Sequence, residues 1–170
     1  MKKISIRNSN ILAVILFLAG LMTVSSFAQE MAVPANLQAA LFKKIFAFDK
    51  TVQAKGSASV VILSTDGSAD EIAAAFSSAG INAKVVKGNS VPGGANIVYV
   101  MPGVASPKAQ CAQKGVLSIS GVTSYVESGK VSIGLMVEGG KPKIVINLAQ
   151  LKAEGQELSS DLLKIAKVIQ

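Results

Sequence analysis

The sequence predicts an α/β fold, a single-domain sandwich in which a mixed sheet is flanked by helices. Two observations carry this prediction. Short apolar runs typical of buried strands alternate with helical segments between residues 35 and 129, as in a mostly parallel sheet. Two alternating segments then flank Gly139-Gly140, as in an antiparallel hairpin. We therefore expect parallel strands that continue into a C-terminal antiparallel hairpin at one edge of the sheet.

Residues 1–28 have the three-part layout of a secretory signal peptide. A basic start precedes an apolar stretch over residues 11–24, and Ser26-Phe27-Ala28 offers a cleavage site between small residues. The alternative is an uncleaved membrane anchor, for which the apolar stretch is of marginal length. We expect export to the periplasm, cleavage near Ala28 and one domain over residues 29–170.

Helices and strands are expected to alternate through the first part of this domain. The expected strands are residues 58–63, 81–86, 95–101 and 116–119, and the expected helices are residues 35–49, 68–78, 107–114 and 121–129. Ser68 and Glu71 have the spacing of a capping box. Ser106 is expected to cap the helix in which Pro107 takes the first position.

The first of these helices, residues 35–49, is rich in phenylalanine. Its spacing predicts an inward stripe formed by Leu37, Leu41, Ile45 and Phe48, widened by Phe42 and Phe46. The alternative is that this stripe binds a partner.

The hairpin has a register that can be counted from its turn. If Gly139-Gly140 is a two-residue turn, the paired positions are all apolar and lie on one face: Val137 with Pro142, Leu135 with Ile144, Ile133 with Ile146, and Val131 with Leu148. The opposite face, with Lys143 and Asn147, is left free for a partner.

The C-terminal residues are expected to be helical. Residues 148–153 add a helical turn that ends at Gly155, and Ser159 or Ser160 then caps a final helix. Its predicted inward residues are Leu162, Leu163, Ile165, Ala166 and Ile169.

The charge of the chain does not favour a nucleic-acid partner. Without Lys2, Lys3 and Arg7 the formal net charge falls from +7 to +4, and no arginine is left. The chain also lacks tryptophan and has two tyrosines. It therefore lacks the bidentate and stacking groups with which proteins usually bind nucleic acids.

The sequence contains few groups suited to catalysis. It has no histidine, which removes the commonest general base near neutral pH. Cys111 is the only cysteine and is either buried and inert or paired with another molecule, although Lys114 could share its helix face. Asp66, Asp70 and Glu71 do not have EF-hand spacing, and the glycine pairs do not form a P-loop. We expect no enzymatic activity, cofactor or metal ion.

Turns after three expected strands provide a candidate ligand or partner site. Ligands of open α/β sheets favour the crevice beyond the carboxyl ends of parallel strands. The residues at this rim are Thr65, Asp66, Gly67, Ser68, Pro102, Gly103, Ser120 and Gly121. The alternative is that they form ordinary turns.

Several segments together resemble the YfiR-like (YfiR/HmsC) family of small exported bacterial proteins. They are GVLSISGVTSYVESG at residues 115–129, the hairpin with KPKIVINL at 141–148, and EGQELSSDLLKIAKVI at 154–169. Weaker agreement comes from ALFKKIFAFDK at 40–50 and IVYVMPG at 97–103. The resemblance implies a periplasmic α/β domain without known catalysis. The best-understood relatives restrain a membrane-bound diguanylate cyclase by contacting its periplasmic sensor part, which lowers cyclic di-GMP and biofilm formation.

Two functions are therefore expected as alternatives. The first is a non-enzymatic regulatory protein that binds a membrane-bound sensor protein such as a diguanylate cyclase. The second is a periplasmic protein that binds a small ligand at the strand-end rim. A homodimer is compatible with either function.

Overall fold

The computed structural model describes residues 31–170, so the expected signal peptide at residues 1–28 lies outside the described residues. The helices are α2 (Ala35–Ala47), α3 (Lys50–Ala54), α4 (Asp70–Ser78), α5 (Lys108–Lys114), α6 (Thr123–Glu127), α7 (Leu148–Ala153) and α8 (Ser160–Ile165). The strands are β1 (Ser59–Ser64), β2 (Asn82–Lys87), β3 (Ile97–Val100), β4 (Leu117–Ser120), β5 (Ile133–Glu138), β6 (Lys141–Asn147) and β7 (Lys167–Ile169).

The strands form one mixed seven-stranded sheet in the order β2-β1-β3-β4-β5-β6-β7. Strands β1 to β5 are parallel to one another. Strand β6 returns antiparallel to β5, and β7 runs parallel to β6. The predicted fold class, a mixed sheet flanked by helices, is confirmed.

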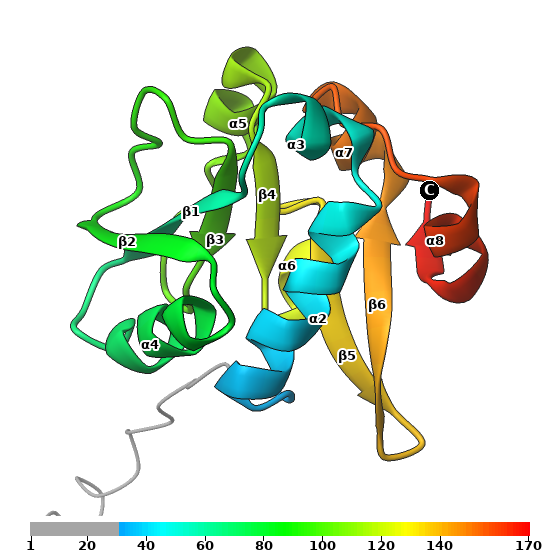
Figure 1. Cartoon of the computed structure of the whole chain (residues 1–170), viewed down its shortest axis with the longest axis horizontal. Helices are drawn as coiled ribbons and strands as arrows, with labels where there is room; N and C mark the ends of the chain where they lie inside the picture. Colours follow the sequence, from blue (N-terminus) through cyan, green and yellow to red (C-terminus); the bar gives the residue numbers. More distant parts are fainter. Residues whose placement is uncertain (1–30) are drawn as a thin grey trace, which may run out of the picture.

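Helices cover both faces of the sheet, with α2 in front of it and α6 behind it in Figure 1. On the front face, aromatic rings join two helices to the sheet. The ring of Phe42 in α2 lies 6.2 Å from that of Phe76 in α4 and 6.1 Å from that of Tyr99 in β3. All three side chains are fully buried, and burial of each ring contributes roughly 2 kcal/mol to stability.

The predicted hairpin register is confirmed from Ile133–Ile146 to Glu138–Lys141. Gly139 and Gly140 have φ angles of 59° and 74°, as a type I′ turn requires. The ladder does not reach the expected pair of Val131 and Leu148, since β5 begins at Ile133 and α7 begins at Leu148.

The expectation that the second face of the hairpin is free is wrong at Asn147. Asn147 is buried because its side chain connects two helices. It accepts a hydrogen bond from the Gln150 backbone N at 2.9 Å, which caps α7, and donates one to the Val126 carbonyl of α6 at 3.0 Å. Lys143 forms an ion pair with Glu138.

The inward stripe of α2 is rotated from the predicted one. Phe42, Ile45 and Phe46 are buried as expected, but Leu37 and Phe48 are 41% and 43% exposed. Gln38 takes a place in the core because its amide group donates to the Val33 carbonyl at 2.6 Å and accepts from the Tyr99 hydroxyl at 2.7 Å. The short helix α3 that follows was not predicted.

The capping box predicted at Ser68 is absent. Asp66 accepts hydrogen bonds from both the backbone N and the hydroxyl of Ser68, so the serine is held in the preceding turn. Helix α4 begins at Asp70 with Ala69 as its N-cap and no side-chain cap. Helix α5 begins one residue later than expected, at Lys108, whose backbone N donates to the Ser106 hydroxyl at 3.4 Å.

The C-terminal helix is shorter than predicted. Ser159 caps it, as expected, by accepting a hydrogen bond from the Leu162 backbone N at 3.3 Å. Leu162 is buried, but Ile165 is 67% exposed, which contradicts its predicted inward position. The reason is that the chain leaves the helix there and pairs residues 167–169 with β6 as strand β7.

Candidate functional site

The predicted rim lies at the carboxyl ends of β1, β3 and β4, because these strands are parallel neighbours in the sheet. Strand order reverses at β1, which has β2 on one side and β3 on the other. The turns after β1 and β3 meet at this point, since the Thr65 hydroxyl oxygen lies 3.5 Å from where a Cβ on Gly103 would be. Such a switch point is the usual ligand position in open α/β sheets.

The rim residues after β4 are closed in by the core. The Ser120 hydroxyl donates to the Val100 carbonyl at 2.8 Å and accepts from the Val122 backbone N. The Gly121 backbone N donates to the Tyr99 hydroxyl, and a Cβ at Gly121 would lie 2.4 Å from the Gln38 amide oxygen. The structure therefore brings together the rim residues after β1 and β3, and it buries Ser120 and Gly121.

The exposed part of the rim is occupied by its own hydrogen bonds. Asp66 accepts from the Ser68 backbone N at 3.0 Å, from the Ser64 hydroxyl at 3.2 Å and from the Ser68 hydroxyl. The hydrogen bonds from Ser68 lower the pKa of the Asp66 carboxyl, so it stays ionised at neutral pH. Pro102 is half-buried, and Gly67 and Gly103 are exposed. The rim carries negative charge and is unsuited to a phosphate.

Cys111 is buried in α5, which is one of its two predicted fates. Burial first, and the nearby Glu154 second, raise the pKa of the thiol to about 12. The thiolate form needed for nucleophilic attack is therefore scarce at neutral pH. The charge of Lys114 lowers this pKa, but by less than burial and Glu154 raise it. Within residues 31–170 no group of three or more potential ligands is placed to hold a metal ion.

Glu154 is a buried carboxylate that sequence reasoning missed. It accepts hydrogen bonds from the backbone N of Ser118 at 3.0 Å, from the amide of Gln150 at 2.8 Å, and from the hydroxyls of Ser118 and Ser132. Burial nevertheless raises its pKa. The four donors come from β4, α7 and the segment before β5, so the cluster ties α7 to the sheet.

A second candidate site is an apolar face on α2, the hairpin and the C-terminal α8–β7 unit. Of the six large apolar side chains that are exposed in the described residues, five belong to it: Leu37, Phe48, Val137, Ile165 and Val168. The sheet register places Val168 beside Ile146 on the side of the sheet that α2 covers. The sixth, Val85, lies on β2 at the other edge of the sheet. Exposed apolar side chains on neighbouring elements are candidates for an interaction surface, and this set is called the apolar face below.

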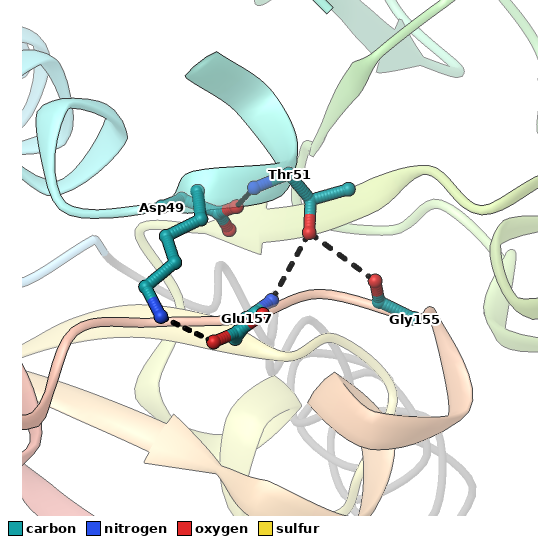
Figure 2. A network of polar contacts seen from close by, with 5 residues as sticks. Asp49, Thr51, Gly155 and Glu157 are labelled. Carbon is teal, nitrogen blue, oxygen red and sulfur yellow. Dashed lines mark hydrogen bonds and ion pairs between the residues drawn. The ribbon is translucent and has the colours of Figure 1, made fainter. Parts of the chain in front are cut away.

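A polar joint fixes Phe48 of the apolar face beside α8, and Figure 2 shows its side chains. Thr51 donates its hydroxyl to the Gly155 carbonyl at 3.3 Å and accepts from the Glu157 backbone N at 3.2 Å. Lys50 forms an ion pair with Glu157. Next to them the Ser159 backbone N donates to the Phe48 carbonyl at 2.9 Å. The start of α3 is thereby attached to the segment that leads into α8.

Asp49 lies under this joint. One of its carboxylate oxygens accepts from the backbone N of Thr51 at 2.8 Å and of Val52 at 3.0 Å, which caps α3. The other oxygen is buried without a partner in the described residues. Burial raises the pKa of this carboxyl. The sequence signal that could have located the cap is the aspartate at the end of the first expected helix, since aspartate is a preferred N-cap residue.

None of the helices within residues 31–170 combines the length and the apolar character that a bilayer span requires.

Comparison with solved structures gives a likeness of fold. A crystal structure described as the ABC domain in complex with L-Trp from Streptococcus pneumonia matches with a TM-score of 0.57 and 16% sequence identity. The match covers 80% of this chain, and the chain spans 60% of the length of that structure. No curated protein matches the sequence.

A family model described as YfiR/HmsC-like matches residues 35–167. The matched range begins with the first residue of α2 and ends with the first residue of β7, so it takes in the rim, the polar joint and most of the apolar face. The chain belongs to the YfiR/HmsC-like family.

Proposed function

We infer that the protein is a non-enzymatic periplasmic regulator that acts by contact with a membrane-bound diguanylate cyclase. Membership of the YfiR/HmsC-like family is the observation that carries this inference, because that family is regulatory and periplasmic. Contact with the periplasmic sensor part of the cyclase restrains it and lowers cyclic di-GMP.

The apolar face supports this proposal and is the surface that we assign to the contact. Interfaces between proteins have apolar centres, and aromatic side chains are enriched there. Phe48 is such an anchor: its ring is nearly half exposed while its backbone is held by the hydrogen bond from Ser159. A rigid backbone under an exposed ring lowers the entropy lost on binding.

Complementation of a deletion strain tests the proposal. Phe48→Ser combined with Ile165→Ser removes the two most exposed side chains of the apolar face, and Val85→Ser is the matched control on β2. We expect deletion to raise cellular cyclic di-GMP, and wild type and Val85→Ser to restore the low level. The double variant leaves it high, and crosslinking in intact cells recovers a diguanylate cyclase with the wild type only.

Two results would contradict the proposal. An unchanged cyclic di-GMP level on deletion removes the cyclase as the target. Full complementation by the folded double variant removes the apolar face as the contact surface, and circular dichroism establishes that the variant is folded.

A small ligand bound at the rim is a second candidate function, favoured by the meeting of Thr65 and Gly103 at the switch point. Saturable shifts in the amide NMR signals of these two residues, on addition of a small-molecule extract of the periplasm, are the expected result. Unchanged signals would remove this candidate.

A further inference from the structure

We propose that a hollow at the end of the sheet where the parallel strands begin, opposite the rim, binds a phosphate group. The hollow has a volume of about 530 Å³ and lies beyond the starts of β1, β3 and β4, between the ends of α3 and α5. It is lined by Lys55, Pro92, Gly93, Gly94, Ala95, Asn96, Lys114 and Val116. No acidic side chain is among the lining residues. This site is independent of the proposed function, because it shares no residue with the apolar face or the rim.

Two ammonium groups from separate helix ends converge on the hollow. Lys55 follows α3 and donates to the Gly115 carbonyl, while Lys114 ends α5 and donates to the Val91 carbonyl. Neither forms an ion pair with a carboxylate of residues 31–170, in contrast to Lys50, Lys143 and Lys164. An ammonium has three donor hydrogens, so each lysine keeps its charge and two hydrogens for a further acceptor.

The glycine loop adds backbone donors to the same hollow. The backbone N–H groups of Gly93 and Gly94 donate no hydrogen bond within the described part of the chain. Gly94 has a φ of 79°, a conformation that favours glycine. A Cβ at either position would meet no atom within 4 Å, so the space beside both Cα atoms is open. Loops of this kind form concave anion sites.

Asn96, which lines the hollow, already has hydrogen-bond partners for its side chain. Asn96 accepts from the Ser59 backbone N at 3.0 Å and donates to the Ser57 carbonyl at 3.1 Å. With Asn96 satisfied, the side-chain groups left over in the hollow are the two positively charged ammonium groups. They therefore select an anion.

Lysine is the only always-charged cationic side chain available in residues 31–170, and it is suited to phosphate. Planar carboxylates are bound best by the fork of arginine, whereas lysine serves phosphate as a point charge. Two lysines with glycine amides match a tetrahedral phosphate, either free or in a lipid headgroup. The acidic rim on the other edge offers no such site.

Binding of inorganic phosphate to the full chain tests the proposal. Titration at constant ionic strength, followed by the amide NMR signals of Gly93 and Gly94, is expected to saturate. Lys55→Gln and Lys114→Gln each weaken binding about tenfold, the effect of losing one charged hydrogen bond at a partly solvated site. Lys114→Arg keeps the charge and keeps binding, and Lys84→Gln on β2 is the matched control.

Vesicles distinguish the source of the phosphate. Sedimentation of the protein is measured with vesicles that contain phosphatidylglycerol. If Lys55→Gln abolishes sedimentation with the vesicles and Lys84→Gln does not, the hollow binds a lipid headgroup. Saturable binding of inorganic phosphate without vesicle binding assigns it to a free phosphate. Absence of both, or an equal loss in Lys84→Gln, overturns the proposal, since the second result reflects net charge alone.

Discussion

Gly134 sets the distance between a helix and the sheet. It lies in β5 under α6, where a Cβ would be 2.5 Å from a methyl carbon of Val126 and 3.0 Å from the Ser120 carbonyl oxygen. Its φ angle is not in the left-handed region. The requirement for glycine at this position is therefore one of space and not of backbone conformation.

Replacement of Gly134 by alanine is expected to lower the free energy of unfolding by about 1–3 kcal/mol, because α6 has to move outward. Urea unfolding followed by circular dichroism measures the loss. Removing methyl groups from the neighbour, as Gly134→Ala with Val126→Ala, should recover part of the loss. Gly67→Ala is the control, since a Cβ there meets no atom within 4 Å. Equal losses in both glycine variants would contradict the steric explanation.

Buried polar residues are the part of the structure that the sequence predicts least. Gln38 is in the core because of its bond to Tyr99, which is 61 residues away. Glu154 is buried because serines from two other segments satisfy it. The spacing of residues within a helix does not reveal partners that are distant in the sequence. Helical periodicity therefore predicted Leu37 as buried and did not predict the burial of Gln38.

At the scale of elements, the contacts in the joint between α3 and the segment before α8 contribute unequally to stability. Asp49 is buried and caps α3 with two hydrogen bonds. The ion pair of Lys50 with Glu157 is exposed, at 66% and 65% of the two side chains. Solvent and salt screen such a pair, so its contribution is small.

We expect Asp49→Ala to cost about 1–2 kcal/mol of unfolding free energy at pH 7, the usual effect of losing an N-cap. Lys50→Gln should cost at most about 0.5 kcal/mol. Urea unfolding at low and high salt measures both. A larger loss for Lys50→Gln than for Asp49→Ala would show that the ion pair, and not the cap, holds the joint.

Helices and strands were predictable where nearby residues in the sequence determine them. The hairpin register follows from Gly139-Gly140 and the alternation around it, and the ladder confirms it up to Ile133. Strand β7 was read as helix because residues 162–169 also fit a helical period. Its pairing with the open edge of β6 depends on the tertiary structure.

At the scale of the whole molecule, pH acts mainly through two buried acids. Burial raises the pKa values of Asp49 and Glu154 above their ordinary 3.8 and 4.5. Such groups bind protons more readily in the folded chain. Their effect is therefore to make the protein most stable below the unfolded pKa and less stable as pH rises through the folded pKa. The chain has no histidine to oppose this trend.

The free energy of unfolding is accordingly expected to be higher near pH 5 than at pH 8. Asp49→Asn with Glu154→Gln should flatten this dependence. Below about pH 4 stability falls again, because hydrogen bonds lower the pKa values of Asp66 and Glu138 and those bonds weaken on protonation. Urea unfolding across this range measures the curve, and greater stability at pH 8 would contradict the assignment.

The overall arrangement was predictable in class but not in detail. Alternation of strands and helices indicated parallel strands, and that placed Thr65 and Pro102 at the same edge of the sheet. Strand order itself is set by packing between distant segments. The closure of Gly121 by Gln38 of α2 depends on that order.

The polar joint also determines when the fold can be completed. Its ion pair links residues 107 positions apart in the chain, and strand β7 follows later still. A chain that emerges from its N-terminus can form α2 and the first four strands early. The segment that holds Phe48 and the strand that covers the edge of β6 come last, and contacts of such long sequence separation slow folding. A chain still being synthesised is therefore kept incompletely folded until nearly all of it has emerged.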